Sequence, residues 1–230
     1  MGAELPRLLR KVRSCTICAS HLAAGPRPVV QVDAAARILI AGQAPGRKVH
    51  ETGVPFDDPS GERLRDWMGL EHEAFYDATL VAILPMGFCY PGSGRSGDLP
   101  PRPECAPEWR SRLLAHLPRV ALTLVIGRYA QAWHLERSGT VTELVGAWRE
   151  YWPEALPLPH PSPRNRIWVL RNPWFEEEVI PALRAKVAEL AERSFEATPT
   201  RSLPRGVRRA RRPSANIRPV PSTPKPWIDR

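Results

Sequence analysis

The sequence predicts an α/β domain built on a parallel sheet, with a basic extension after it. Four short apolar runs have the length and the glycine or proline boundaries of buried strands. These runs are residues 37–42, 79–84, 120–127 and 155–158. Segments with helical periodicity separate them. Alternation of strands and helices is typical of a parallel sheet, because each strand needs a crossover before the next can run in the same direction.

Helices are expected before, between and after these runs. A first helix is predicted over residues 5–12, where apolar residues recur on one face. Further helices are predicted over residues 60–69, 108–117, 128–135 and 142–151, and from residue 172 onward. Ser60 and Asn172 are the types of residue that cap helices, and each is expected to begin one. Pro181 is expected to bend or delay the last helix.

Three loops follow predicted strands at the ends where ligands bind in such sheets. The first is Gly42-Gln-Ala-Pro-Gly46, whose glycines allow the backbone to approach a ligand closely. The second opens at Pro85 and continues as a long loop over residues 86–107, which is expected to be functional or held by something. The third contains His160. Because parallel strands end at one edge of the sheet, we expect these loops to form one site.

His160 is the main catalytic candidate. Prolines on both sides restrict the backbone and present one imidazole from a rigid loop. The segment 162–168 follows it with cations, polar residues and a tryptophan, the types that hold a nucleic-acid backbone and base. Taken alone, the stretch is better explained as a proline-rich turn with an incidental histidine. The other loops change that interpretation.

The four cysteines indicate a metal centre. They are Cys15, Cys18, Cys89 and Cys105. The expected cytosolic location argues against structural disulfides, and the spacing does not fit a zinc ribbon, whose second half would also be a close pair. Both later cysteines fall in the long loop, which is expected to lack structure of its own. Four thiolates suit an iron–sulfur cluster or a structural zinc, and the spacing does not decide between them. Four unrelated buried thiols are the simpler alternative.

The charge divides the chain into a predicted catalytic domain, residues 1–193, and a tail, residues 194–230. The tail carries nine basic and two acidic side chains, a net +7, whereas the remaining residues carry 24 and 22, a net +2. Its prolines and lack of large aliphatics predict disorder, and its charge predicts added affinity for nucleic acid. A solvated extension without a role is the alternative. No signal peptide or membrane-length apolar run is evident, so a cytoplasmic protein is expected.

Three groups of residues together resemble the uracil-DNA glycosylase superfamily. The segment 42–46 followed by Gly53-Val-Pro-Phe56 is similar to its first motif, and His160-Pro-Ser-Pro-Arg-Asn165 is similar to its second. The cysteine spacing resembles the iron–sulfur branch, family 4. The segments 52–56, 65–69 and 160–165 are more similar to the single-strand-selective monofunctional branch. The resemblance extends from about residue 5 to residue 190.

The resemblance implies a three-layer α/β/α fold with a central four-stranded parallel sheet, and hydrolysis of the bond between uracil and deoxyribose in flipped-out DNA. The implied catalytic residues are His160, as donor to the departing base, and Gln43. The implied base-binding residues are Phe56, Ala44 and Gly42; the DNA-binding residues are Ser162, Arg164, Asn165 and Arg166; the metal ligands are Cys15, Cys18, Cys89 and Cys105. The implied cofactor is a 4Fe-4S cluster, with structural zinc as the alternative.

Two positions depart from the family pattern. Ala44 stands where several branches carry a carboxylate or amide that positions water, and the end of the second strand run, residues 81–86, lacks the usual asparagine that contacts uracil. Asp57 and Asp58 are the alternative water-positioning groups, and His50 is a possible base in the same loop. A glycosylase for hypoxanthine, xanthine or an oxidised pyrimidine, and a non-catalytic metal-bearing DNA-binding protein, are the alternative functions. A monomer without lyase activity is expected.

Overall fold

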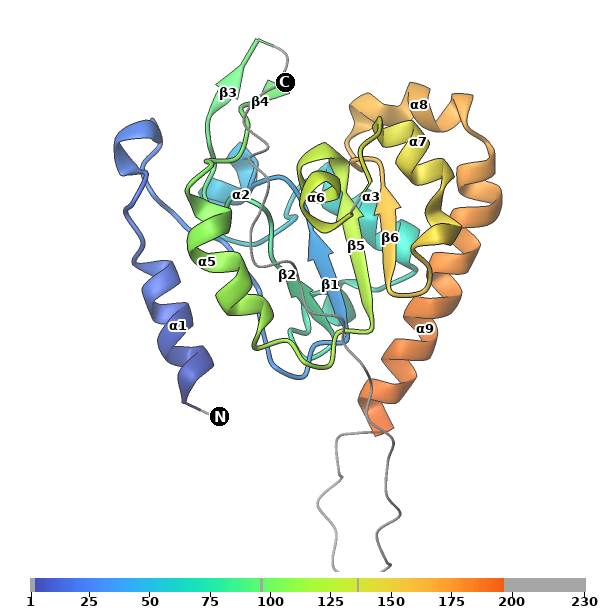
Figure 1. Ribbon diagram of the computed structural model, residues 1–230, viewed down its shortest axis with the longest axis horizontal. Coiled ribbons are helices and arrows are strands. Elements are labelled where there is room, and N and C mark those ends of the chain that lie inside the picture. The colour runs from blue at the N-terminus through green and yellow to red at the C-terminus, as the bar shows by residue number, and fades with distance from the viewer. Residues whose placement is uncertain (1–2, 96, 136, 197–230) are drawn as a thin grey trace, which may run out of the picture.

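The computed structural model describes residues 3–95, 97–135 and 137–196, and a four-stranded parallel sheet lies at its centre (Figure 1). The strands are β1 (Ile38–Ala41), β2 (Val81–Ile83), β5 (Leu122–Ile126) and β6 (Ala155–Leu158). Their order in the sheet is β2-β1-β5-β6, and every pair is parallel. The predicted fold class and all four predicted strands are confirmed.

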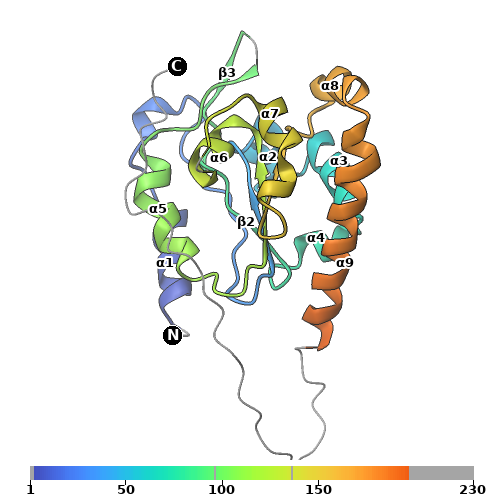
Figure 2. The ribbon, with the colours of Figure 1, turned by 45° about the vertical axis from the view of Figure 1, so that its right-hand side comes forward.

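Alternate residues of each strand point to opposite faces of the sheet, and helices cover both faces. The face that carries Ile38 and Ile40 packs against α3 (Pro59–Met68), α4 (His72–Tyr76) and α9 (Ile180–Glu196). The face that carries Leu39 packs against α1 (Glu4–Arg13) and α5 (Cys105–Leu114), and the neighbouring Ala41 and Val125 pack against α6 (Gly127–His134). Figure 2 shows the two helical layers on either side of the strands.

Two helix caps differ from the sequence predictions. Asp58, and not Ser60, caps α3: its Oδ1 accepts a hydrogen bond from the Gly61 N–H at 2.9 Å. Pro59 then occupies the first helical position, where its missing N–H costs nothing. The amide of Asn172 donates to the Trp168 carbonyl at 2.7 Å and makes no cap. Before Pro181 the chain forms one wide π turn, η4 (Phe175–Val179), and so the proline delays the regular helix as predicted.

Several short elements were not predicted. They are α2 (Arg47–Thr52), α4, α8 (Arg166–Arg171), the 3₁₀ turns η1 (Ala19–His21) and η3 (Pro163–Asn165), and a hairpin of β3 (Ser93–Gly94) and β4 (Gly97–Asp98). The predicted helix over residues 142–151 is α7 (Val141–Gly146) followed by the turn η2 (Trp148–Glu150). The long loop therefore contains a hairpin, and it ends where α5 begins at Cys105. The prediction that this loop lacks structure was wrong.

The prediction of a tail over residues 194–230 falls almost wholly outside the described residues, since α9 is followed only to Glu196. Among the described residues, no helix combines the length and the apolarity that spanning a membrane requires.

Candidate active site

A pocket of about 270 Å³ lies at the carboxyl edge of the sheet. It is lined by the loop 42–46 after β1, by Pro85 after β2 and by His160 after β6, together with Phe56 and Asp58 from the segment before α3. The structure therefore brings together the three loops that the sequence placed at one edge.

His160 is held as a neutral imidazole. Its Nδ1 accepts a hydrogen bond from the Ser162 N–H at 3.2 Å, which assigns the proton of the neutral ring to Nε2. Burial lowers the pKa of His160 below its ordinary value of 6.5, and the nearby carboxylates of Asp58 and Asp98 oppose this shift. At neutral pH the ring is therefore uncharged and has one N–H available for donation.

The loop after His160 is braced from within. The Asn165 amide donates to the His160 carbonyl at 2.7 Å, and the Ser162 hydroxyl accepts from the Arg164 N–H at 3.3 Å. The structure thus places Ser162 and Asn165 as residues that order the loop. Arg164 lines the pocket and Arg166, the first residue of α8, is exposed.

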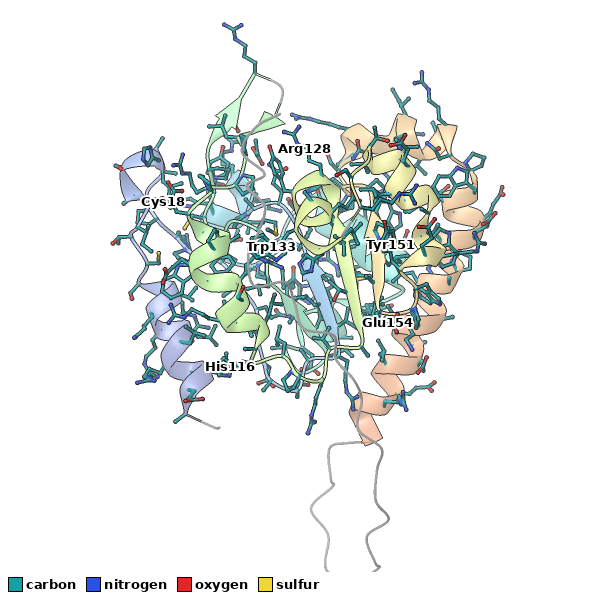
Figure 3. All side chains as sticks on the ribbon, in the orientation of Figure 1. Cys18, His116, Arg128, Trp133, Tyr151 and Glu154 are labelled. Atoms are coloured by element: carbon teal, nitrogen blue, oxygen red, sulfur yellow. The ribbon has the colours of Figure 1, made fainter. Side chains whose placement is uncertain are left out.

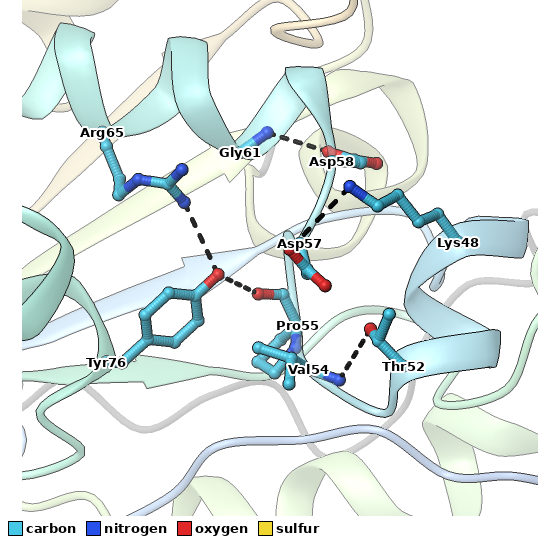
Figure 4. Close-up of polar contacts among 9 residues, drawn as sticks. All are labelled: Lys48, Thr52, Val54, Pro55, Asp57, Asp58, Gly61, Arg65 and Tyr76. Carbon is cyan, nitrogen blue, oxygen red and sulfur yellow. Dashed lines mark hydrogen bonds and ion pairs between the residues drawn. The ribbon is translucent and has the colours of Figure 1, made fainter.

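Phe56 occupies a strained position beside the first loop. Its φ is +55°, a left-handed value that only a well-packed surrounding maintains in a non-glycine residue. The ring lies beside Gly42, where a Cβ would stand 3.7 Å from Cζ, and meets Phe75 edge-on at 6.2 Å. At Gly61 a Cβ would stand 1.7 Å from the Phe56 carbonyl oxygen, so only glycine fits beneath this turn. The Tyr76 hydroxyl donates to the Pro55 carbonyl at 3.0 Å and fixes the segment (Figure 4).

The first loop is tied to the end of β2. The carbonyls of Gly42 and Gln43 accept hydrogen bonds from the N–H groups of Met86 and Gly87 at 2.8 and 2.9 Å. The Gln43 amide reaches the other way and donates to the Leu99 carbonyl, just after the hairpin, at 3.0 Å. Ala44 lines the pocket but brings no polar side-chain group.

Of the candidate residues for positioning or activating water, only Asp58 lines the pocket. Asp57 Oδ1 lies 4.0 Å from the Lys48 ammonium (Figure 4). Asp57 does not line the pocket, whereas Asp58 does. His50 also lies outside the lining; its ring centroid is 5.9 Å from that of Tyr90. Asp98, at the end of β4, lines the pocket and was missed in the sequence. The one sequence feature that could have indicated Asp98 is its place in the long loop after the second predicted strand, at the edge of the sheet where ligands bind.

The two apolar residues at the end of the segment that follows His160 are placed differently. Ile167 is 62% exposed on α8, whereas the Trp168 Nε1–H donates to the Thr142 hydroxyl at 2.7 Å and its ring meets Phe175 edge-on. Ile167 therefore faces outward, whereas Trp168 is partly buried and packs against the core.

The four cysteines lie around a second, more apolar pocket, which we call the cysteine pocket; Figure 3 marks Cys18, which follows α1. Its lining comprises Cys15, Cys18, Cys89 and Cys105 with Ile17, Pro28, Phe88, Arg102, Glu104 and Trp109. The Phe88 N–H donates to the Cys105 sulfur at 3.3 Å. Burial, with a smaller contribution from the neighbouring thiols, raises the pKa of Cys105 to about 12 and that of Cys89 to about 11. In the absence of a cation, these thiols stay protonated.

The donor set of the cysteine pocket is chemically suited to a metal group. Sulfur ligands, apolar walls and a backbone N–H to sulfur are the surroundings that iron–sulfur clusters use. Among the described residues, no three His, Cys, Asp or Glu side chains are arranged to hold one metal ion. The cofactor therefore stays a prediction.

Residues 29–184 match the family model described as the uracil DNA glycosylase superfamily. The matched region includes every strand of the sheet and the pocket loops, but it begins after Cys15 and Cys18. Among solved structures, the chain is similar to a proposed uracil DNA glycosylase from Methanosarcina acetivorans. The identity is 18% and the TM-score 0.42, and the match covers 70% of this chain and 94% of that one.

Proposed function

Because this chain belongs to the uracil DNA glycosylase superfamily, and therefore to a group of enzymes that act on DNA, we propose that it removes uracil from DNA and leaves an abasic site. The pocket of about 270 Å³ supports this proposal. It is smaller than the roughly 300–1,000 Å³ pockets that hold drug-sized ligands, and its size suits a single base. A base inside a duplex must first be flipped out of the stack to enter it.

The observation that carries the proposal is the state of His160. When the glycosidic bond breaks, negative charge develops on the uracil oxygens. A preorganised donor in a pocket that excludes water stabilises such charge most effectively. The His160 Nε2–H is that donor, because the Ser162 N–H occupies Nδ1 and burial keeps the ring neutral. The Phe56 ring, held beside Gly42, stacks on the flipped base.

The test is base release from oligonucleotides that contain a single uracil, with alkali used to reveal abasic sites. Release from single- or double-stranded substrate is the expected result. Binding of uracil-DNA without base release would reject the enzyme and favour the DNA-binding alternative.

One observation favours a second base specificity. The end of β2 brings Ile83 and Pro85 to the pocket, and neither side chain carries an amide that could contact the uracil edge. The same oligonucleotides carrying hypoxanthine, xanthine or an oxidised pyrimidine distinguish the two possibilities. If one of these bases is released faster than uracil, that base and not uracil is the preferred substrate.

We propose a monofunctional enzyme that acts as a monomer. An abasic lyase needs an amine that attacks the sugar. Lys48 lies beside Asp57, and no lysine of the described part of the chain lines the pocket. Borohydride reduction during turnover should therefore trap no protein–DNA adduct. Light scattering tests the monomer.

We propose a 4Fe-4S cluster in the cysteine pocket, held by Cys15, Cys18, Cys89 and Cys105. When bound, it would provide a structural link between the segment after α1 and the two ends of the long loop. Support comes from the shared pocket and from the Phe88 N–H on the Cys105 sulfur. Iron and sulfide analysis of anaerobically purified protein, with a visible absorbance band, tests it. If the purified protein is colourless and contains zinc, the pocket holds a structural zinc and not an iron–sulfur cluster.

A further inference from the structure

We propose that Asp98, on the β3–β4 hairpin, holds and deprotonates the water that attacks the sugar, and thereby supplies the function that the side chain of Ala44 cannot. This inference rests on the proposed glycosylase activity and adds a catalytic residue to it. Water becomes a better nucleophile when a carboxylate accepts its proton as the bond to carbon forms. Among the described residues, Asp58 and Asp98 are the carboxylates that line the pocket.

Gly46 shows where such a water can lie. The position that a Cβ would take on Gly46 is 3.5 Å from Asp98 Oδ2 and 3.8 Å from Asp58 Oδ2. Because Gly46 has no side chain, this position stays open between two acceptors. Both carboxylates also act on the charge of His160 across the same pocket. The space beside Gly46 thus faces both acids and belongs to the pocket of the imidazole.

The other contacts of the two acids favour Asp98 as the base. Asp58 already accepts the Gly61 N–H through Oδ1 and caps the first turn of α3, so this carboxylate is engaged in holding the helix. Asp98 Oδ1 accepts a hydrogen bond from the Ser93 hydroxyl at 3.1 Å, and the Ser93 oxygen lies 2.7 Å from the Tyr90 hydroxyl. These neutral groups orient Asp98 and leave its Oδ2 toward Gly46.

The hairpin is fixed to both motif loops. The Gln43 amide donates to the Leu99 carbonyl at 3.0 Å, immediately after Asp98. From the other side, Arg164 reaches the hairpin so closely that a Cβ on Gly97 would stand 2.8 Å from its Nη1. Two side chains of the motif loops therefore contact the hairpin, and they place Asp98 over the pocket.

The water oxygen forms a bond to C1′ while the bond from C1′ to the base nitrogen breaks. The proton of the water passes to the Asp98 carboxylate. The electron pair of the broken bond stays on the departing base, whose anion accepts a hydrogen bond from the His160 Nε2–H. Asp98 then returns its proton to solvent or to the departing base.

The experiment compares Asp98→Asn with wild type in single-turnover uracil release at saturating enzyme. The rate should fall about 100-fold, the lower end of what a general base contributes. DNA affinity in a gel shift should not fall, because a negative charge is removed from a DNA-facing surface. Asp57→Asn is the matched control: it makes the same chemical change outside the pocket lining and should keep the wild-type rate.

Two results would overturn the inference alone: wild-type release with Asp98→Asn, or a loss confined to Asp58→Asn, whose amide can still cap α3. A wild-type protein that releases neither uracil nor another base would instead overturn the proposed function, and the inference with it. The two failures are therefore distinguishable from the wild-type reaction.

Discussion

The active-site pocket and the cysteine pocket are assembled in different ways. The active-site loops start directly at strand ends and are fastened by hydrogen bonds of the protein itself, such as Met86 N–H to the Gly42 carbonyl and Ser162 N–H to His160. The cysteines come from outside the sheet: two follow α1 and two flank the hairpin segment. The polypeptide alone therefore organises the first pocket, whereas the cluster proposed for the second would link segments that lie outside the sheet.

The electrostatics of the two pockets point the same way. In the active-site pocket, burial stabilises the neutral imidazole that the proposed mechanism uses. In the cysteine pocket, burial and the neighbouring sulfurs raise the pKa values of Cys89 and Cys105, so that thiolates form there only beside a cation. Loss of the proposed cluster should thus disturb the hairpin side of the molecule more than the His160 loop.

The largest expected effect comes from removing the His160 imidazole from the active-site pocket. His160→Ala should lower the single-turnover rate of base release by about 10²–10³-fold, the typical cost of removing one preorganised donor. The melting temperature should change little, because half-buried His160 packs in a loop and not in the core. His116→Ala, near the opposite edge of the sheet in Figure 3, is the matched control and should keep the rate. Equal rates for the two variants would contradict the assigned donor.

The parts of the active-site pocket that were predictable from the sequence lie next to predicted strands in the chain. The loop 42–46 and the segment around His160 each follow an apolar run directly, so a strand-by-strand interpretation places both at one edge. The fold was predictable for the same reason, since buried parallel strands are continuous apolar runs. For the cap of α3, the pair Asp58-Pro59 was a better signal than Ser60, because proline favours the first helical position.

The missed parts depend on long-range contacts. The β3–β4 hairpin has two residues in each strand and a glycine-rich sequence, so no periodicity marks it. Its position is set by the Gln43 amide, 56 residues away from Leu99, and by Arg164. Asp98 therefore looked like an ordinary loop acid. The short α8 was missed because Pro163 and the polar residues that follow are typical of a turn.

The next largest effect is expected from replacing one sulfur of the cysteine pocket. Cys105→Ser should remove most of the bound iron, because a hydroxyl is a poor substitute for a thiolate, and should lower the melting temperature. Base release should fall less than in His160→Ala, since the imidazole loop has its own hydrogen bonds. Iron analysis, visible absorbance and thermal unfolding measure these outcomes. Full iron content in Cys105→Ser would exclude this residue as a ligand.

A smaller effect concerns acidity in the active site. Since the pKa of His160 in the folded protein lies below 6.5, its neutral form and the accompanying stability are complete above pH 6.5 and are lost as the pH falls through the lower, folded value. The rate of base release should therefore stay level as the pH falls from neutral to 6.5. Asp98→Asn should lower this pKa further, because it removes a carboxylate that raises it. NMR titration of the imidazole measures the pKa of His160 in wild type and in Asp98→Asn, and the rate of base release is followed over the same pH range. A titration midpoint at or above 6.5 in wild type would contradict the neutral ring.

The smallest effect on chemistry is expected from the basic tail, which tests whether binding can be changed without changing either pocket. Removal of residues 197–230, which lie outside the described part of the chain, deletes nine Lys/Arg side chains and one acidic residue. Each phosphate contact contributes about 0.9 to the slope of log affinity against log salt on duplex DNA. The truncated protein should therefore show a shallower slope in equilibrium DNA binding, whereas its single-turnover rate at saturation and its iron content should equal those of the full chain. An unchanged slope would show that the tail makes no phosphate contacts, and a reduced rate at saturation would show that it takes part in assembling the active site.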